Sequence, residues 1–148
     1  MINFYLEGQS PLDSESILKI SKAINEVLKN DKELSLGLSF VDSNTIQELN
    51  EKYAGNNYPT DVLSFDYKDD KEASGDGDIV ICTEIAKSQS EDNNISFESE
   101  LTLLVVHGAL HILGYDHQNA KEVASLDALQ GDIMKKLNYE YRDFLWSH

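Results

Sequence analysis

Residues 101–117 read LTLLVVHGALHILGYDH, an apolar run followed by three histidines. Its first six residues are largely apolar and contain neither glycine nor proline, which predicts a helix buried in the core. His107 and His111 are four residues apart, so a helix places both imidazoles on one face. Gly114 is expected to end the helix, because glycine tolerates the left-handed geometry of a C-terminal turn. Beyond that turn, His117 can fold back toward the other two histidines.

Three imidazoles with an open fourth position are the ligand set of a catalytic zinc ion. The sequence therefore predicts His107, His111 and His117 as ligands of one zinc ion per chain, and nickel would accept the same ligands. The spacing H-x3-H-x5-H resembles that of the metzincin peptidases, in which a glutamate follows the first histidine and acts as general base. This chain has Gly108 there, so ordinary peptidase chemistry is disfavoured. The alternative interpretation is three histidines that never meet a metal.

Length and composition indicate one domain spanning residues 1–148, because 41% hydrophobic content is enough for a single core. Cys82 is the only cysteine, which excludes an internal disulfide and predicts a buried thiol. The first residues have no basic start and no long apolar run, so neither a signal peptide nor a membrane span is expected. These features predict a cytoplasmic protein. The fourth histidine, His148, is expected to lie in a disordered chain end.

The net charge of −15 disfavours long-range attraction to a polyanion. The chain has 27 acidic side chains against 12 basic ones, and its only arginine is Arg142. A solvated acidic surface accounts for most of these charges. A bound metal would then be the main cation of the site, and it can hold a phosphate oxygen without help from the surface.

Hydrophobic periodicity and turn residues predict strands and helices along the whole chain. Asp13 or Ser14 is expected to cap the first helix, Ser43 the second and Ser96 the metal-bearing one. No internal repeat or linker indicates a second domain. The predicted strands are 2–6, 34–41, the later part of 58–66, and 77–82. The first two predicted helices begin at 13 or 14 and at 43, and the second fades near 53–55. A third helix begins at about 83, and two more cover 97–113 and about 120–137. Residues 68–76 are expected to form an exposed connection.

The segment HGALHILGYDH at 107–117 resembles the HGxLHLxGYDH signature of the YbeY family of bacterial endoribonucleases, also called the rRNA maturation factor family. The resemblance extends to Leu49-Asn50, to YPTDVLSF at 58–65 and to GDIVI at 77–81, in the family's order and spacing. Together with the closing helix, these blocks cover nearly the whole chain. The signature is specific because it has glycine in place of the peptidase glutamate and Tyr-Asp before the last histidine.

The resemblance implies an α+β fold with a four-stranded mixed sheet packed with helices, the metal-binding helix lying near the C-terminal half. It also implies a zinc-dependent endoribonuclease that acts on single-stranded RNA. The expected role is maturation of ribosomal RNA at the 3′ end of the small-subunit RNA, together with ribosome quality control. Proteins of the ribosome or of preribosomal particles are the expected partners, and no membrane is involved.

Two departures from the family pattern concern the cleft expected around the metal site. The family has an aromatic-Arg-Gly step whose arginine is taken to bind phosphate, whereas this chain has Ala54 between Tyr53 and Gly55. An alanine can neither hold a phosphate nor stabilise developing charge, and the neighbouring Lys52 is a candidate replacement. The second departure is Asp66, where family members often carry proline; it is expected to add negative charge near the cleft. Both changes predict weakened or lost nuclease activity.

The general base is not identified by the sequence, and three residues are candidates for catalytic roles. Asp116 is expected either to orient a histidine ligand or to cap the turn after the helix. Tyr115 is interpreted either as a hydrogen-bond donor to substrate or as a packing residue, and Asp61 either as part of the cleft or as the start of a strand. Thr60 and Ser64 are interpreted as structural, because neither has an adjacent base.

Two further functions compete with the ribonuclease. One is a non-catalytic ribosome-assembly factor that keeps the metal for structure, which the missing arginine favours. The other is a metal hydrolase of a different bond, including a peptide bond, which the missing glutamate disfavours.

Overall fold

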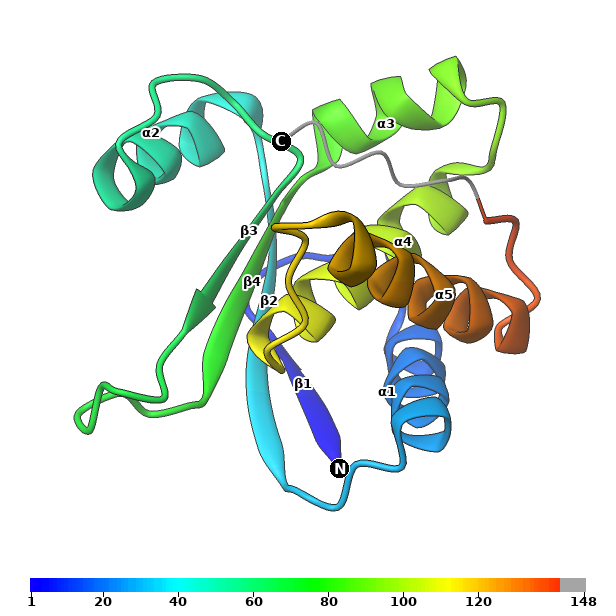
Figure 1. Cartoon of the computed structure of the whole chain (residues 1–148). Helices are drawn as coiled ribbons and strands as arrows, with labels where there is room; N and C mark the ends of the chain where they lie inside the picture. Colours follow the sequence, from blue (N-terminus) through cyan, green and yellow to red (C-terminus); the bar gives the residue numbers. More distant parts are fainter. Residues whose placement is uncertain (142–148) are drawn as a thin grey trace.

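The structure is a computed structural model that describes residues 1–141, and these form a four-stranded mixed sheet with five helices (Figure 1). The predicted α+β class is confirmed. Arg142 and His148 lie outside the described residues. In chain order the elements are β1 (Ile2–Leu6), α1 (Ser14–Leu28), β2 (Leu34–Val41), α2 (Ser43–Ala54), β3 (Val62–Asp66), β4 (Gly77–Cys82), α3 (Thr83–Asp92), α4 (Phe97–Ile112) and α5 (Ala120–Lys136).

The sheet has the strand order β1-β2-β4-β3. β1 and β4 both pair with β2 in parallel, and β3 pairs with β4 antiparallel. Parallel neighbours need a crossover, and α1 makes the one between β1 and β2. The two central strands are therefore the most buried, and Leu36, Leu38, Ile79 and Ile81 are fully enclosed.

Acidic side chains begin the first two helices. The backbone N–H of Ser16 donates to the Asp13 carboxylate at 2.7 Å, so Asp13 is the cap of α1. The prediction that Ser43 caps α2 is wrong. The cap is Asp42, whose extended backbone lets its carboxylate accept from the Thr45 N–H at 2.8 Å, whereas Ser43 is already the first helical residue.

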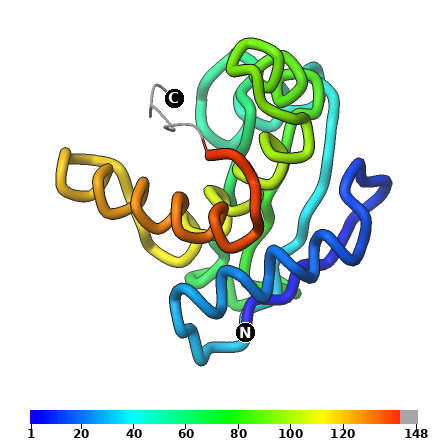
Figure 2. The backbone as a smooth tube through the Cα atoms, turned by 90° about the vertical axis from the view of Figure 1, so that its right-hand side faces the viewer, coloured from blue at the N-terminus to red at the C-terminus, as the bar shows by residue number. Residues whose placement is uncertain are grey.

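The helix α4 lies between the sheet and α5, packed against β3 and β4 on one side and α5 on the other (Figure 1). Ser96 caps its start, and nearly every residue from Ser99 to Ile112 is buried. Gly114 follows with a φ of +102°, so the predicted left-handed turn is present. Figure 2 is viewed from the helical side, with α1 and α5 in front of the sheet.

The opposite face of the sheet carries a second, smaller core. Ile46 of α2 packs there with Val80 and Cys82 of β4, so the single cysteine is buried as expected. This packing holds α2 against β4. Within residues 1–141, no helix is both long and apolar enough to cross a membrane.

Candidate metal centre

The three predicted ligands come together at the end of α4. The ring centroids lie 6.3 Å apart for His107 and His111, 6.4 Å for His107 and His117, and 6.2 Å for His111 and His117. The rings therefore stand at the corners of a nearly equilateral triangle. His107 is buried, His117 is half-buried, and His111 is exposed at the last turn of the helix. An ion between them would be reachable from solvent.

A hollow of about 240 Å³ opens beside this triangle. It is bounded by the end of α2, by the connection from α2 to β3 and by the first part of β3, so segments some 50 residues apart in sequence form one cavity. Most of the non-histidine lining consists of neutral polar groups. The lining residues are Asn50, Ala54, Asn56, Tyr58, Thr60, Val62, Leu63, Ser64, His107, His111 and His117.

The donor set fits a tetrahedral metal ion. To hold one zinc ion together, the three rings would have to move about 1 Å closer to one another than they stand here. Among the described residues, the set of possible ligand atoms that all lie within 4.8 Å of one another belongs to His111, Asp116 and His117 and leaves out His107. Asp116 does not line the hollow, whereas all three histidines do, so we favour the three-histidine set.

Asp116 combines the two roles considered for it. Its Oδ1 accepts a hydrogen bond from the backbone N–H of His117 at 2.7 Å, which supports the turn. The same oxygen lies 3.5 Å from His117 Nδ1, which is the ring nitrogen that would not bind the metal if Nε2 were the ligand. Asp116 is therefore placed to orient His117.

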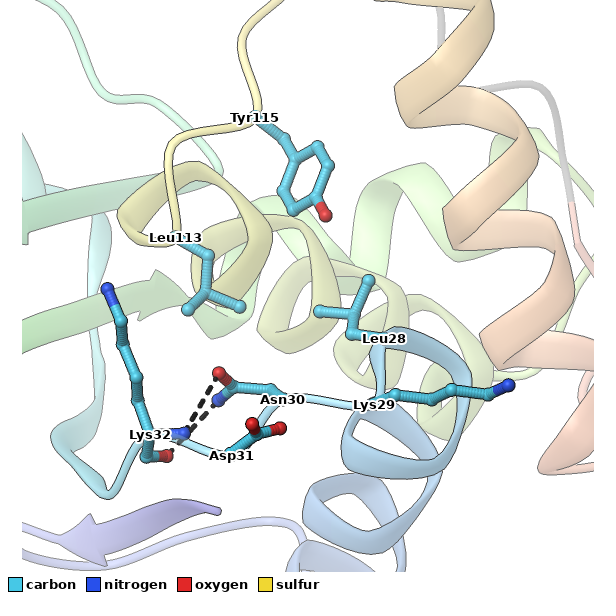
Figure 3. Close-up of a pocket in the computed structure, with 7 residues that line it drawn as sticks. All are labelled: Leu28, Lys29, Asn30, Asp31, Lys32, Leu113 and Tyr115. Carbon is cyan, nitrogen blue, oxygen red and sulfur yellow. Dashed lines mark hydrogen bonds between the residues drawn. The ribbon is translucent and has the colours of Figure 1, made fainter.

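Tyr115 faces a different cavity (Figure 3). Its ring points toward Leu28 and Leu113, in a hollow of about 340 Å³ closed on the far side by the connection from α1 to β2. Lys29 and Lys32 lie at the edges of that hollow. Tyr115 does not line the histidine hollow, which disfavours a hydrogen bond from it to a substrate at the metal centre, and its side chain is exposed rather than packed in the core.

Asp61 is buried and directed away from the hollow that its neighbours Thr60 and Val62 line. Its Oδ2 accepts a hydrogen bond from Gln89 Nε2 of α3 at 3.3 Å. Its backbone carbonyl accepts from the Cys82 N–H at 2.9 Å. These contacts support the interpretation of Asp61 as the start of a strand.

Gly108 occupies the position of the peptidase glutamate and faces the sheet. A β-carbon there would lie 2.8 Å from Ile79 Cγ2 and 3.1 Å from Ser64 Oγ. The Ser64 hydroxyl donates to the Gly108 carbonyl at 3.4 Å. A glutamate at this position would point into β3 and β4 rather than toward the three histidines.

The hollow has no lysine or arginine among the lining residues that the structure describes. Ala54 lines it at the end of α2, but the ammonium of Lys52 lies 5.1 Å from the centre of the Tyr53 ring. Asp66 also lies outside the lining, and its carboxylate accepts from the Lys68 N–H at 3.0 Å. The structure therefore supports neither Lys52 as a replacement cation nor Asp66 as a charge in the hollow.

Two residues beside the site have no role assigned to them by sequence reasoning. Asn50 is buried, lines the hollow, and donates from Nδ2 to the Tyr58 carbonyl at 2.9 Å. Gln130 is fully buried on α5, and its Oε1 lies 3.0 Å from His107 Nδ1. The signal in both cases is a polar residue on the apolar face of an amphipathic helix.

Comparisons with known proteins agree with the motif pattern. The family model described as endoribonuclease YbeY matches residues 8–138. A curated relative of that description from Syntrophomonas wolfei is 40% identical and covers 94% of this chain and 92% of its own length. Relatives of the same description from Syntrophus aciditrophicus and Macrococcus caseolyticus are 43% and 35% identical, covering 85% and 88% of this chain and 81% and 91% of their own lengths.

A solved structure shares the fold. The solution structure of a protein from Thermotoga maritima superposes with a TM-score of 0.61 and covers 93% of this chain and 92% of its own. The two sequences are 24% identical, so this likeness concerns the fold alone.

Proposed function

Because the chain belongs to the endoribonuclease YbeY family, as its motifs predict, we propose that it is a metal-dependent endoribonuclease that cleaves single-stranded RNA. The substrate we propose is ribosomal RNA, cleaved during maturation of the 3′ end of the small-subunit RNA. Ribosome quality control in the cytoplasm is the wider role.

The observation that supports this proposal is the triangle of three histidines opening onto a polar hollow. Zinc, one ion per chain, is the metal we propose, with nickel as the alternative. When bound, zinc supplies the Lewis acidity that activates water and polarises a phosphoryl oxygen, which phosphodiester hydrolysis at neutral pH requires. His107, His111 and His117 would hold it.

The other residues of the hollow supply neutral hydrogen-bonding groups. Asn56 carries an amide group that can donate to the oxygens of a phosphodiester, whereas the Thr60 and Ser64 hydroxyls already donate to Asp61 and to the Gly108 carbonyl. Exposure of His111 leaves room for a chain that passes across the site. Asp116 supports His117, and we assign no residue as general base.

Charge indicates how the substrate is held. The net charge is −15, and no lysine or arginine within residues 1–141 lines the hollow, so a bound metal would be the main attraction for phosphate there. Attachment to a long RNA then depends on other molecules. Ribosomal or preribosomal proteins, which are rich in positive charge, would provide it.

A non-catalytic ribosome-assembly factor is the second candidate function, and Ala54 favours it. This residue lines the hollow where the family's arginine stands, so no fixed cation from this position meets a developing phosphoryl charge. Hydrolysis of a peptide bond is less favoured, because Gly108 faces the sheet and leaves the usual base position without a carboxylate.

The experiment compares zinc-loaded wild-type protein with His111→Ala on a single-stranded RNA that resembles the 3′ end of small-subunit ribosomal RNA. We expect only the wild type to cleave the RNA. The wild type should hold about one zinc ion per chain, and His111→Ala should have lost its zinc. A peptide and a simple phosphodiester serve as parallel substrates.

Cleavage by both proteins at equal rates would contradict the proposal, because a contaminant would then explain it. Stoichiometric zinc without cleavage of free RNA or of RNA within preribosomal particles would favour the assembly factor. Unchanged zinc content in His111→Ala would show that the assigned ligands are wrong.

A further inference from the structure

A chain of hydrogen bonds links the buried histidine of the metal centre to the outer side of α5. Gln130 Oε1 lies 3.0 Å from His107 Nδ1, and Gln130 Nε2 lies 3.3 Å from the Tyr141 hydroxyl. The Tyr141 hydroxyl in turn donates to Asp127 Oδ1. Gln130 has no exposed surface, so each end of its amide depends on these protein partners.

The donor and acceptor roles along this series of hydrogen bonds follow from Asp127, its last member. An ionised carboxylate only accepts hydrogen bonds, so the single hydrogen of the Tyr141 hydroxyl is donated to Asp127. The oxygen of Tyr141 must then accept from the Gln130 side chain, which requires the amide NH₂ to face Tyr141. The amide oxygen of Gln130 consequently faces His107.

An amide oxygen beside a ring nitrogen selects one tautomer of a neutral histidine. Gln130 Oε1 can only accept, so Nδ1 of His107 carries the hydrogen. Nε2 then keeps its lone pair, which is the form of imidazole that binds a metal ion. With the other tautomer, the lone pair would lie at Nδ1, facing α5.

We propose that Gln130 is a positioning residue of the metal centre, and that Tyr141 and Asp127 orient its amide so that His107 presents Nε2 as a ligand. The proposal rests on the metal-binding part of the proposed function. It makes α5 a part of the site, although no residue of α5 lines the hollow. Partners of this kind typically change metal affinity by about 10- to 100-fold when removed.

The test is zinc affinity of the full chain, measured by competition with a chelator and independent of RNA cleavage. Gln130→Met keeps the length of the side chain and removes both hydrogen bonds, so zinc binding is expected to weaken about 10- to 100-fold. Gln130→Glu keeps an acceptor toward His107. It is therefore expected to bind zinc more tightly than Gln130→Met and to restore most of the zinc affinity that Gln130→Met loses. Leu126→Met, a volume-conserving change at a buried position of α5, controls for packing and is expected to leave the affinity within about 2-fold.

A second measurement detects the tautomer directly in the metal-free protein. Nitrogen-15 NMR of the imidazoles is expected to show His107 protonated at Nδ1 in the wild type and a mixture of tautomers in Gln130→Met. Asp127→Asn places a donor at the far end of the chain and is expected to shift the same signal in the same direction. This measurement remains decisive even if a Gln130 variant folds poorly, because the wild type alone is sufficient.

His107 protonated at Nε2 in the wild type would overturn the proposal, as would zinc affinity of a folded Gln130→Met within 2-fold of the wild type. The outcome for RNA is separate. Weakened zinc binding in Gln130→Met with no RNA cleavage by any variant would support the positioning role and contradict the nuclease. RNA cleavage by the wild type with unchanged zinc affinity in Gln130→Met would support the nuclease and contradict the positioning role.

Discussion

Gly108 of α4 lies so close to Ile79 of β4 that a β-carbon at Gly108 would be 2.8 Å from Ile79 Cγ2. Real β-carbons almost never approach other heavy atoms so closely, so the buried Ile79 side chain, the helix or the sheet would have to shift. Glycine therefore sets how near α4 lies to the sheet. His107, the residue immediately before Gly108 in α4, lines the hollow from a helix that packs against β3 and β4.

Gly108→Ala is expected to destabilise the fold by about 1 kcal/mol. Overpacking costs roughly 1–3 kcal/mol, and the better helix propensity of alanine offsets about 1 kcal/mol of it. Thermal and urea unfolding measure the change. Gly131→Ala on α5 is the matched control, because its β-carbon would meet Tyr141 at an ordinary 3.5 Å, and it is expected to stabilise. A Gly108→Ala protein stabilised as much as Gly131→Ala would contradict the close approach.

Gly108→Glu is expected to fold poorly and to gain no peptidase activity. The longer side chain meets the same contacts with Ile79 and Ser64 and is directed into the sheet. Circular dichroism and a fluorogenic peptide assay measure the two effects. A folded variant that cleaves peptides would show that this position reaches the metal.

Ala54→Arg is expected to increase cleavage of single-stranded RNA. Ala54 lines the hollow, so a guanidinium introduced there can form charge-assisted hydrogen bonds to phosphate, worth about 1.5–3 kcal/mol, or roughly 10- to 100-fold in kcat/KM. Ala54→Met adds length without charge and is the control. Equal rates for both variants would rule out charge as the missing element.

Removal of the metal is expected to leave the fold intact. Leu103, Leu104 and Leu110 of α4 are buried in an apolar core that requires no ion. Zinc at 100 times its Kd stabilises by about 2.7 kcal/mol, so chelation should lower the Tm by roughly 5–10 °C and abolish cleavage. Circular dichroism before and after chelation distinguishes this from a structural metal, for which the helical signal would collapse.

Glu7→Gln is expected to raise stability at neutral pH. The carboxylate of Asp78 lies beside Glu7 above Gly37 and raises the pKa of Glu7 from its usual 4.5. An acid whose pKa is raised on folding contributes stability below its unfolded value and loses that contribution as pH rises through the folded value. The Tm of the variant should therefore exceed that of the wild type at pH 7 but not at pH 3.

The control for this prediction is Glu48→Gln, which removes an exposed carboxyl of α2. Its Tm is expected to follow the wild type between pH 3 and pH 7. An equal rise in both variants would assign the effect to net charge rather than to the pair of Glu7 and Asp78.

Most helices and strands follow from local features of the sequence and do not depend on tertiary packing. The strand Gly77–Cys82 and the helix from Phe97 agree with the predicted starts, because a continuous apolar run and a Ser96 cap depend only on neighbouring residues. The cap of α2 was misassigned to Ser43, since adjacent Asp and Ser both favour that position and only the backbone angles distinguish them. The approach of His117 to His107 and His111 was expected because all three lie within eleven residues.

The order of strands and helices, the three histidines and the family can all be predicted from the sequence, because each depends on a short stretch of chain. The sequence does not predict that Gly108 faces the sheet, that Asp61 turns toward α3 or that Gln130 of α5 meets His107. The physical reason is that each of these contacts joins segments that are distant along the chain. Their direction depends on how helices and sheet pack, which no local pattern specifies.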